Sequence, residues 1–195
     1  MTVQLIPVLE IQLNNIDAPL LDRETLVPYS VGLDFYRISD LSESNLSEVV
    51  AKHTEALRNA EYAREEASAL FGGYVLKVKG KDVYFPQCCG DLSDIRYWEQ
   101  LVTAKSPIPG NGHPAPIVVI EKLRVKLNFA IDEVEEKFVP EPLHKSINIS
   151  KEELRVALSE ARVELMDFAQ KLNKINEERL FGLQDIDKLL IWGDS

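Results

Sequence analysis

The stretch "GGYVLKVKGKDVYFP", which runs from Gly72 to Pro86, decides the fold class of this 195-residue chain. Apolar and other residues alternate from Tyr74 to Val78, Gly80 and Asp82 mark a tight turn, and β-forming residues follow it. This pattern is typical of two antiparallel strands joined by a short turn. The hairpin therefore favours an antiparallel sheet over the parallel sheet of a βαβ protein.

Apolar residues at helical spacing predict a long helix before the hairpin, from about Leu46 to Leu70. Asn45 and Glu48 stand three residues apart, as in a capping box at a helix start. The glycines at 72 and 73 are expected to end this helix.

A second long helix is predicted from about residue 151 to Ile175, after a capping box formed by Ser150 and Glu153. Its apolar residues recur every three or four positions: Leu154, Leu158, Ala161, Leu165, Phe168 and Leu172.

Shorter patterns complete the fold. We expect a strand within 2–13, a helix after Asp91 that buries Ile95 and Trp98, one or two strands in 117–131, and a brief helix near Trp192. The predicted class is α+β, with a small antiparallel sheet packed against two long helices plus shorter helical elements. We expect one domain over 1–195, with an internal boundary, if one exists, at the Pro- and Gly-rich segment 105–116.

Composition limits the function. The net charge of −10 disfavours nucleic-acid binding, because an acidic surface repels phosphates, and it favours encounter with a basic protein. The N-terminal residues resemble a strand, not a signal peptide, and no apolar run is long enough to span a membrane. We therefore expect a cytoplasmic protein without a membrane partner.

Both cysteines of the chain, Cys88 and Cys89, follow the hairpin directly. A thiol near a helix N-terminus can be reactive, with His113 or His144 as a base, and this gives one hypothesis: a thiol-dependent enzyme or redox sensor. A metal site would need more ligands at suitable spacing, so none is expected. Because unpaired cysteine is usually buried, we favour a third interpretation, in which both pack as small apolar residues between hairpin and helix.

Two other residues are candidates for binding. Tyr97 lies off the apolar face of its predicted helix, so we expect an exposed ring that could anchor a partner. His113 lies in the 105–116 loop, where long ordered loops often make contacts.

No set of residues resembles a catalytic site, so we expect a non-enzymatic protein-binding protein without a cofactor. An immunity or antidote role, with a basic toxin as partner, is a narrower form of this hypothesis. A third class is an assembly protein that oligomerises through the apolar tail ending at Trp192.

Overall fold

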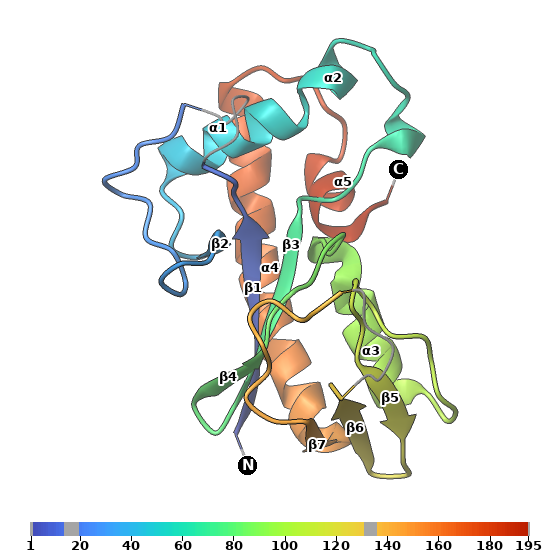
Figure 1. Ribbon diagram of the computed structural model, residues 1–195. Coiled ribbons are helices and arrows are strands. Elements are labelled where there is room, and N and C mark those ends of the chain that lie inside the picture. Colours follow the sequence, from blue (N-terminus) through green and yellow to red (C-terminus); the bar gives the residue numbers. More distant parts are fainter. Residues whose placement is uncertain (1, 14–19, 131–135, 195) are drawn as a thin grey trace. The chain divides into compact units, whose positions relative to one another are not determined.

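A computed structural model describes residues 2–13, 20–130 and 136–194 (Figure 1). The fold is α+β, as predicted, but it has two antiparallel sheets and one long helix. The sheets have the strand orders β2-β1-β3-β4 and β5-β6-β7. The strands are β1 (Val3–Glu10), β2 (Phe35–Arg37), β3 (Gly72–Val78), β4 (Lys81–Tyr84), β5 (Ile117–Ile120), β6 (Arg124–Asn128) and β7 (Ser146–Ser150). The α-helices are α1 (Glu43–His53), α2 (Glu55–Arg58), α3 (Ile95–Thr103), α4 (Lys151–Glu178) and α5 (Ile186–Trp192).

The chain forms two compact units, each discontinuous in sequence. The first contains Met1–Ile6, Gly73–Gly90 and Asp94–Val163, and the second contains Pro7–Gly72, Asp91–Ser93 and Glu164–Ser195. The segment 105–116 therefore lies inside the first unit. The residues of β1, β3 and α4 are divided between the two units.

The predicted hairpin lies in the first unit and is confirmed. β3 pairs with β4 in antiparallel fashion, with Val78 opposite Lys81. The two residues between them, Lys79 and Gly80, have φ angles of 53° and 75°. Positive φ at both positions is the signature of a type I′ turn, whose twist matches that of the strands.

The three-stranded sheet of the first unit includes one strand that the sequence did not indicate. β5 and β6 confirm the strands expected in 117–131, and β7 pairs with β6 along its whole length. Val118, Leu127 and Ile147 form a buried row across the three strands. This row shows that β7, although it follows a proline-containing break, alternates between a buried and an exposed face like its neighbours.

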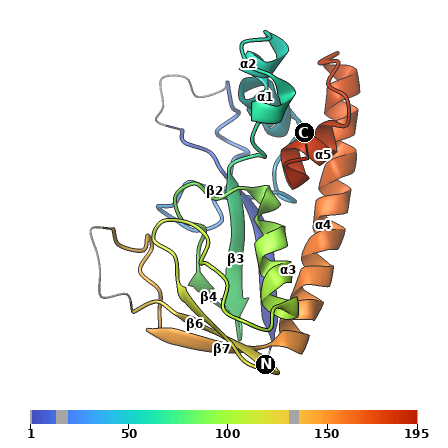
Figure 2. The same cartoon turned by 90° about the vertical axis from the view of Figure 1, so that its right-hand side faces the viewer.

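Helix α3 lies beside the first part of α4 in this unit (Figure 2). Arg162 Nε donates to Glu99 Oε1 at 2.6 Å, and Lys151 Nζ donates to the carbonyl oxygen of Ala104 at 2.8 Å. The predicted capping box of α4 is confirmed, since Glu153 N donates to Ser150 Oγ at 3.1 Å and Ser150 Oγ donates back to the Glu153 carboxylate at 2.9 Å. The predicted apolar stripe of α4 is buried from Leu154 to Ile175.

In the second unit, β1 and β2 pair in antiparallel fashion. Glycine at position 72 is needed for the close approach of two backbones. Gly72 has φ +141°, and a Cβ added there would lie 2.1 Å from the Val8 carbonyl oxygen. Gly72 is therefore the first residue of β3. The sequence-based expectation that it ends a helix is wrong.

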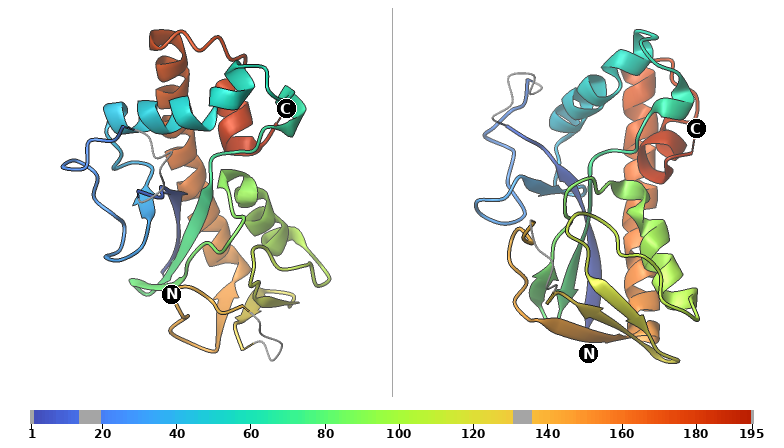
Figure 3. Two further views of the ribbon diagram at one scale, coloured as in Figure 1. Left: turned by 45° about the horizontal axis from the view of Figure 1, so that its top comes forward. Right: turned by 45° about the vertical axis from the view of Figure 1, so that its right-hand side comes forward.

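The second part of α4 packs with α1 and α5 in the second unit (Figure 3). Arg179 Nε donates to Ser47 Oγ at 2.5 Å, and its guanidinium also pairs with Glu48. Arg37, from β2, forms a two-pronged ion pair with Glu164 at 3.1 Å. These pairs fix the polar borders of the apolar stripe, because bidentate guanidinium contacts are directional.

The predicted helix from Leu46 to Leu70 is wrong at both ends. α1 begins earlier, with Ser42 as the N-cap, and Asn45 instead turns its buried side chain to the backbone of Asp22. The helix is interrupted at Thr54, which has φ −95° and ψ 3°, and the Thr54 hydroxyl there donates to the Val50 carbonyl oxygen at 2.8 Å.

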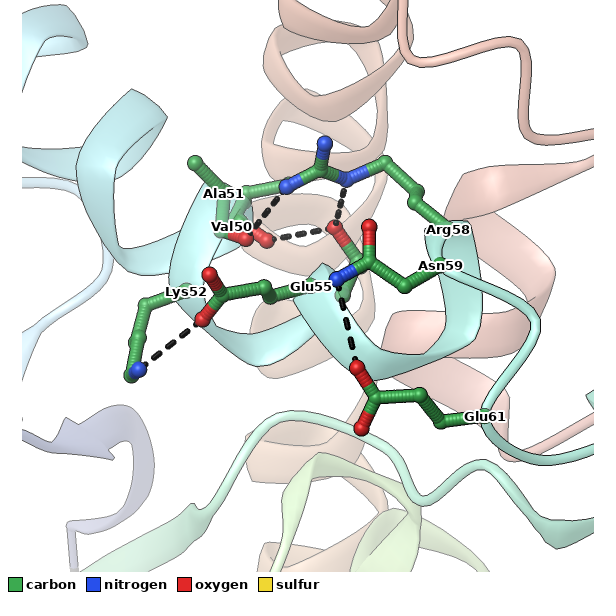
Figure 4. Close-up of polar contacts among 8 residues, drawn as sticks. Val50, Ala51, Lys52, Glu55, Arg58, Asn59 and Glu61 are labelled. Carbon is green, nitrogen blue, oxygen red and sulfur yellow. Dashed lines mark hydrogen bonds and ion pairs between the residues drawn. The ribbon is translucent and has the colours of Figure 1, made fainter.

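Side chains cross the interruption between α1 and α2. Figure 4 shows the Arg58 guanidinium reaching back to the carbonyl oxygen of Ala51, at 2.8 Å, and Lys52 paired with Glu55 at 2.9 Å. The Arg58 guanidinium also lies 4.6 Å from the centre of the Phe181 ring. These contacts hold α2 against its neighbours although none of its residues is buried.

The helix ends at Ala60, which has φ +56°. The Glu61 N–H donates to the Ala56 carbonyl oxygen and the Ala60 N–H to that of Leu57, which together form a Schellman motif. Glycine or asparagine usually marks this position, so alanine gives no sequence signal. α4 ends in the same way, with Leu180 at φ +53°.

Among the helices within residues 2–13, 20–130 and 136–194, none is long and apolar enough to cross a membrane.

The positive φ of Ala60 predicts that glycine at this position increases stability. Ala60→Gly should stabilise the protein by about 0.5 to 1 kcal/mol, because glycine adopts positive φ without a Cβ clash. The matched change Ala51→Gly, inside α1, should destabilise it by about 1 kcal/mol. Urea unfolding followed by circular dichroism measures both changes. A loss of stability in Ala60→Gly would show that the helix does not end there.

Candidate functional site

The two cysteines lie in a tight turn of the first unit. The Gly90 N–H donates to the Gln87 carbonyl oxygen at 3.2 Å, and Cys89 has φ +68°. Both thiols are exposed and reduced, with their sulfur atoms 3.3 Å apart. A positive φ at the third of the four residues is typical of a type II turn.

The expectation that Cys88 and Cys89 are buried is therefore wrong. The apolar positions next to them are filled by larger residues, since Phe85 before the turn and Trp98 in α3 are both buried. The turn leaves the sulfur atoms in solvent, where they can react.

The loop 105–116 folds back onto this turn. Cys88 and His113 form an isolated antiparallel β-bridge, and the Tyr84 hydroxyl donates a long hydrogen bond, 3.4 Å, to the Asn111 carbonyl oxygen. Gly112 has φ +85°, and a Cβ added there would lie 3.1 Å from Cβ of Gln87. Glycine thus allows the loop to approach the turn. We call the exposed side chains of Cys88, Cys89 and His113 the turn–loop surface.

The side chain of Gln87 holds the turn in place through hydrogen bonds to backbone groups. Its side-chain NH₂ lies within 2.9 to 3.2 Å of three carbonyl oxygens, those of Phe85, Pro86 and Val139, and its Oε1 accepts from the Val139 N–H at 3.0 Å. The side chain is 8% exposed. Sequence reasoning missed this residue, since a single glutamine beside two cysteines carries no pattern.

A small pocket lies beneath the turn–loop surface. Its walls are Tyr74, Tyr84, Pro86, Gln87, Gly90, Asp94, Tyr97, Trp98, Asn111 and Gly112. The centre of a water molecule can occupy about 20 Å³ of it, which is enough for about one water and far too little for a typical organic ligand.

Tyr97 lines this pocket and is less exposed than the sequence suggested. Its ring is half-buried against Trp98, with ring centres 5.8 Å apart. Its hydroxyl is buried and has no hydrogen-bond partner of good geometry among the described residues, although the Asn111 backbone lies near enough to oppose the pKa shift. Burial raises the pKa of Tyr97 to about 12. The expectation of an exposed Tyr97 ring is therefore not met, and its role as an anchor for a partner stays a prediction.

An aromatic cluster forms the floor of the site. Tyr84 stacks on Phe129, with ring centres 5.5 Å apart, and meets Trp98 and Phe138 edge-on at 6.4 and 6.2 Å. Burial, and then nearby Tyr97 and Asp94, raise the pKa of Tyr84. The Tyr84 hydroxyl is held above this cluster in its neutral form and donates to the Asn111 carbonyl oxygen of the loop.

The three histidines have different surroundings. His113 and His144 are exposed in the first unit. His53, in the second unit, is half-buried, and its Nε2 lies 3.0 Å from the Ser68 carbonyl oxygen, so Nε2 carries the proton and donates. Burial lowers the pKa of His53, although this hydrogen bond opposes the change. The role of His113 or His144 as a base for the thiols stays a prediction.

Within the part of the chain that the structure describes, no three His, Cys, Asp or Glu side chains group together as metal ligands. Comparison with models of protein families, with curated proteins and with solved structures gave no match.

Replacing Gln87 tests the fastening of the turn. Gln87→Met keeps the length of the side chain but none of its hydrogen bonds, and should lower the free energy of unfolding by about 2 to 3 kcal/mol. Gln87→Glu should cost more at neutral pH, because a carboxylate would face three carbonyl oxygens. Urea unfolding at pH 7 gives both values, and equal stability of Gln87→Met and the parent would refute the fastening role.

Proposed function

We propose that this chain is a protein-binding protein that contacts its partner through the turn–loop surface. The observation that carries the proposal is the bridge between Cys88 and His113, which joins two loops that are 25 positions apart in sequence into one exposed surface. Loops held by a rigid scaffold are common contact surfaces.

Prior ordering of this surface supports the proposal. Association costs less when the contacting segments are already held in place, because less conformational entropy is lost on binding. Gln87 fastens the turn with four hydrogen-bond contacts, and Gly112 lets the loop lie against it. A partner would therefore meet a surface whose backbone is fixed before contact.

The negative net charge of the chain favours a basic protein as its partner. With a net charge of −10, the chain attracts a basic protein and speeds their encounter at low ionic strength. A basic toxin, to which this chain would act as an antidote, is the narrower form of the proposal. Its support is the acidity of the chain and the absence of a substrate-sized pocket at the described site.

The test begins with capture of partners by the tagged full chain from a lysate of the source organism, beside an unrelated acidic bait. A captured protein is then purified and titrated by calorimetry. His113→Ala should weaken its binding about tenfold, as expected for a residue near the centre of an interface.

His144→Ala is the matched control, because it removes another exposed histidine from a different loop of the same unit. It should leave the affinity unchanged, and both variants should unfold like the parent. Binding should also weaken as salt is added. Equal affinities for the two variants would contradict the assignment of the surface, and the lack of a specific partner would contradict the function.

A further inference from the structure

We propose that Cys88 and Cys89 close to a reversible disulfide when the protein meets a peroxide. The sulfur atoms are exposed and 3.3 Å apart, whereas a disulfide bond is about 2.05 Å long. Closure therefore requires the sulfur atoms to approach by about 1.2 Å. The inference concerns the thiols themselves and does not depend on protein binding.

The chemistry balances with hydrogen peroxide as the oxidant. One thiol gives up its proton, its sulfur attacks a peroxide oxygen, and the O–O bond breaks; the hydroxide that leaves takes up this proton, so a sulfenic acid and one water form. The neighbouring thiol then gives up its proton and attacks that sulfur, the S–O bond breaks as the S–S bond forms, and the hydroxide that leaves takes up the second proton as a second water. The two sulfur atoms lose two electrons in total, which the two peroxide oxygens gain.

The bond between adjacent residues should be easily reduced. Neighbouring α-carbons lie about 3.8 Å apart across a trans peptide, which is shorter than the 4.4 to 6.8 Å usual for a disulfide, so the bond is strained. Strained and exposed disulfides have more oxidising potentials and are typical of regulatory pairs. Thiol reductants should therefore restore the dithiol readily.

A disulfide between Cys88 and Cys89 would change the conformation of the loop 105–116. Forming the bond changes the backbone angles of Cys88 and Cys89, and Cys88 is bridged to His113. Gln87 is held in place by its side-chain hydrogen bonds, so the change in backbone angles should not extend through it to β4. The structural effect of oxidation is thus expected at residues 111–113.

The test uses the reduced full chain treated with hydrogen peroxide and analysed by mass spectrometry. The expected product has lost about two mass units, the two thiol hydrogens, and neither cysteine is alkylated until a reductant is added. The exposed Met166 can also take up oxygen, so each oxygen is assigned to a residue by peptide mapping. Products in which Cys88 or Cys89 gains oxygen atoms, or that link two chains, would overturn the proposal.

Cys88→Ser and Cys89→Ser are the controls, because each keeps the turn but leaves one thiol. Neither variant should lose two hydrogens, and each should remain open to sulfenic acid formation. In nuclear magnetic resonance spectra, peroxide should shift the amide signals of Asn111 and Gly112 in the parent but not in Cys88→Ser, whose remaining thiol is not on the bridged residue. Equal shifts in both would overturn the link between the disulfide and the loop.

Discussion

The apolar stripe of α4 is the feature on which both units depend, because each unit packs on its own part of this helix. Seven residues at helical spacing are buried: Leu154, Leu158, Ala161, Leu165, Phe168, Leu172 and Ile175. Burial of each large member contributes about 1.5 to 3 kcal/mol. Polar contacts such as Arg162 with Glu99 in the first unit, and Arg37 with Glu164 in the second, then fix how neighbours meet the helix.

The first unit uses this framework to support two irregular segments. The loop 105–116 has a composition typical of a connector, yet its end is held against the cysteine turn by a β-bridge and by Tyr84. The aromatic cluster around Tyr84 fills the space below, so the surface needs no regular secondary structure of its own. Two loops therefore form one contact surface, and its exposed thiols give it a chemical property that a binding surface alone would lack.

Sequence reasoning recovered the elements whose periodicity was strong. The hairpin, the strand at the N-terminus, α3 and α4 with its cap at Ser150 were all predicted, because burial of one face imposes a repeat on the sequence. β2 has only three residues and β7 follows a proline-containing break, so neither repeat was long enough to recognise. The early end of the first helix depends on Ala60 at positive φ, which no composition rule indicates.

The site was predictable only in part. Cys88, Cys89, His113 and Tyr97 were all candidates, and the structure brings them to one region of the first unit. The exposure of the two cysteines and of Tyr97 was misjudged, because it depends on the turn at Cys89, which has a positive φ, and on the packing of Tyr97 against Trp98. Gln87 could not be found at all, since its partner Val139 is 52 positions away.

The central claim is that the turn at 87–90 and the loop at 111–113 form one ordered surface. Amide hydrogen exchange of the full chain, resolved by residue, tests it most directly. We predict that the Gly90 amide and the bridging amides of the two segments exchange together, and much more slowly than those of an unfolded peptide. Exchange of these amides at the rate of an unfolded chain would contradict the claim.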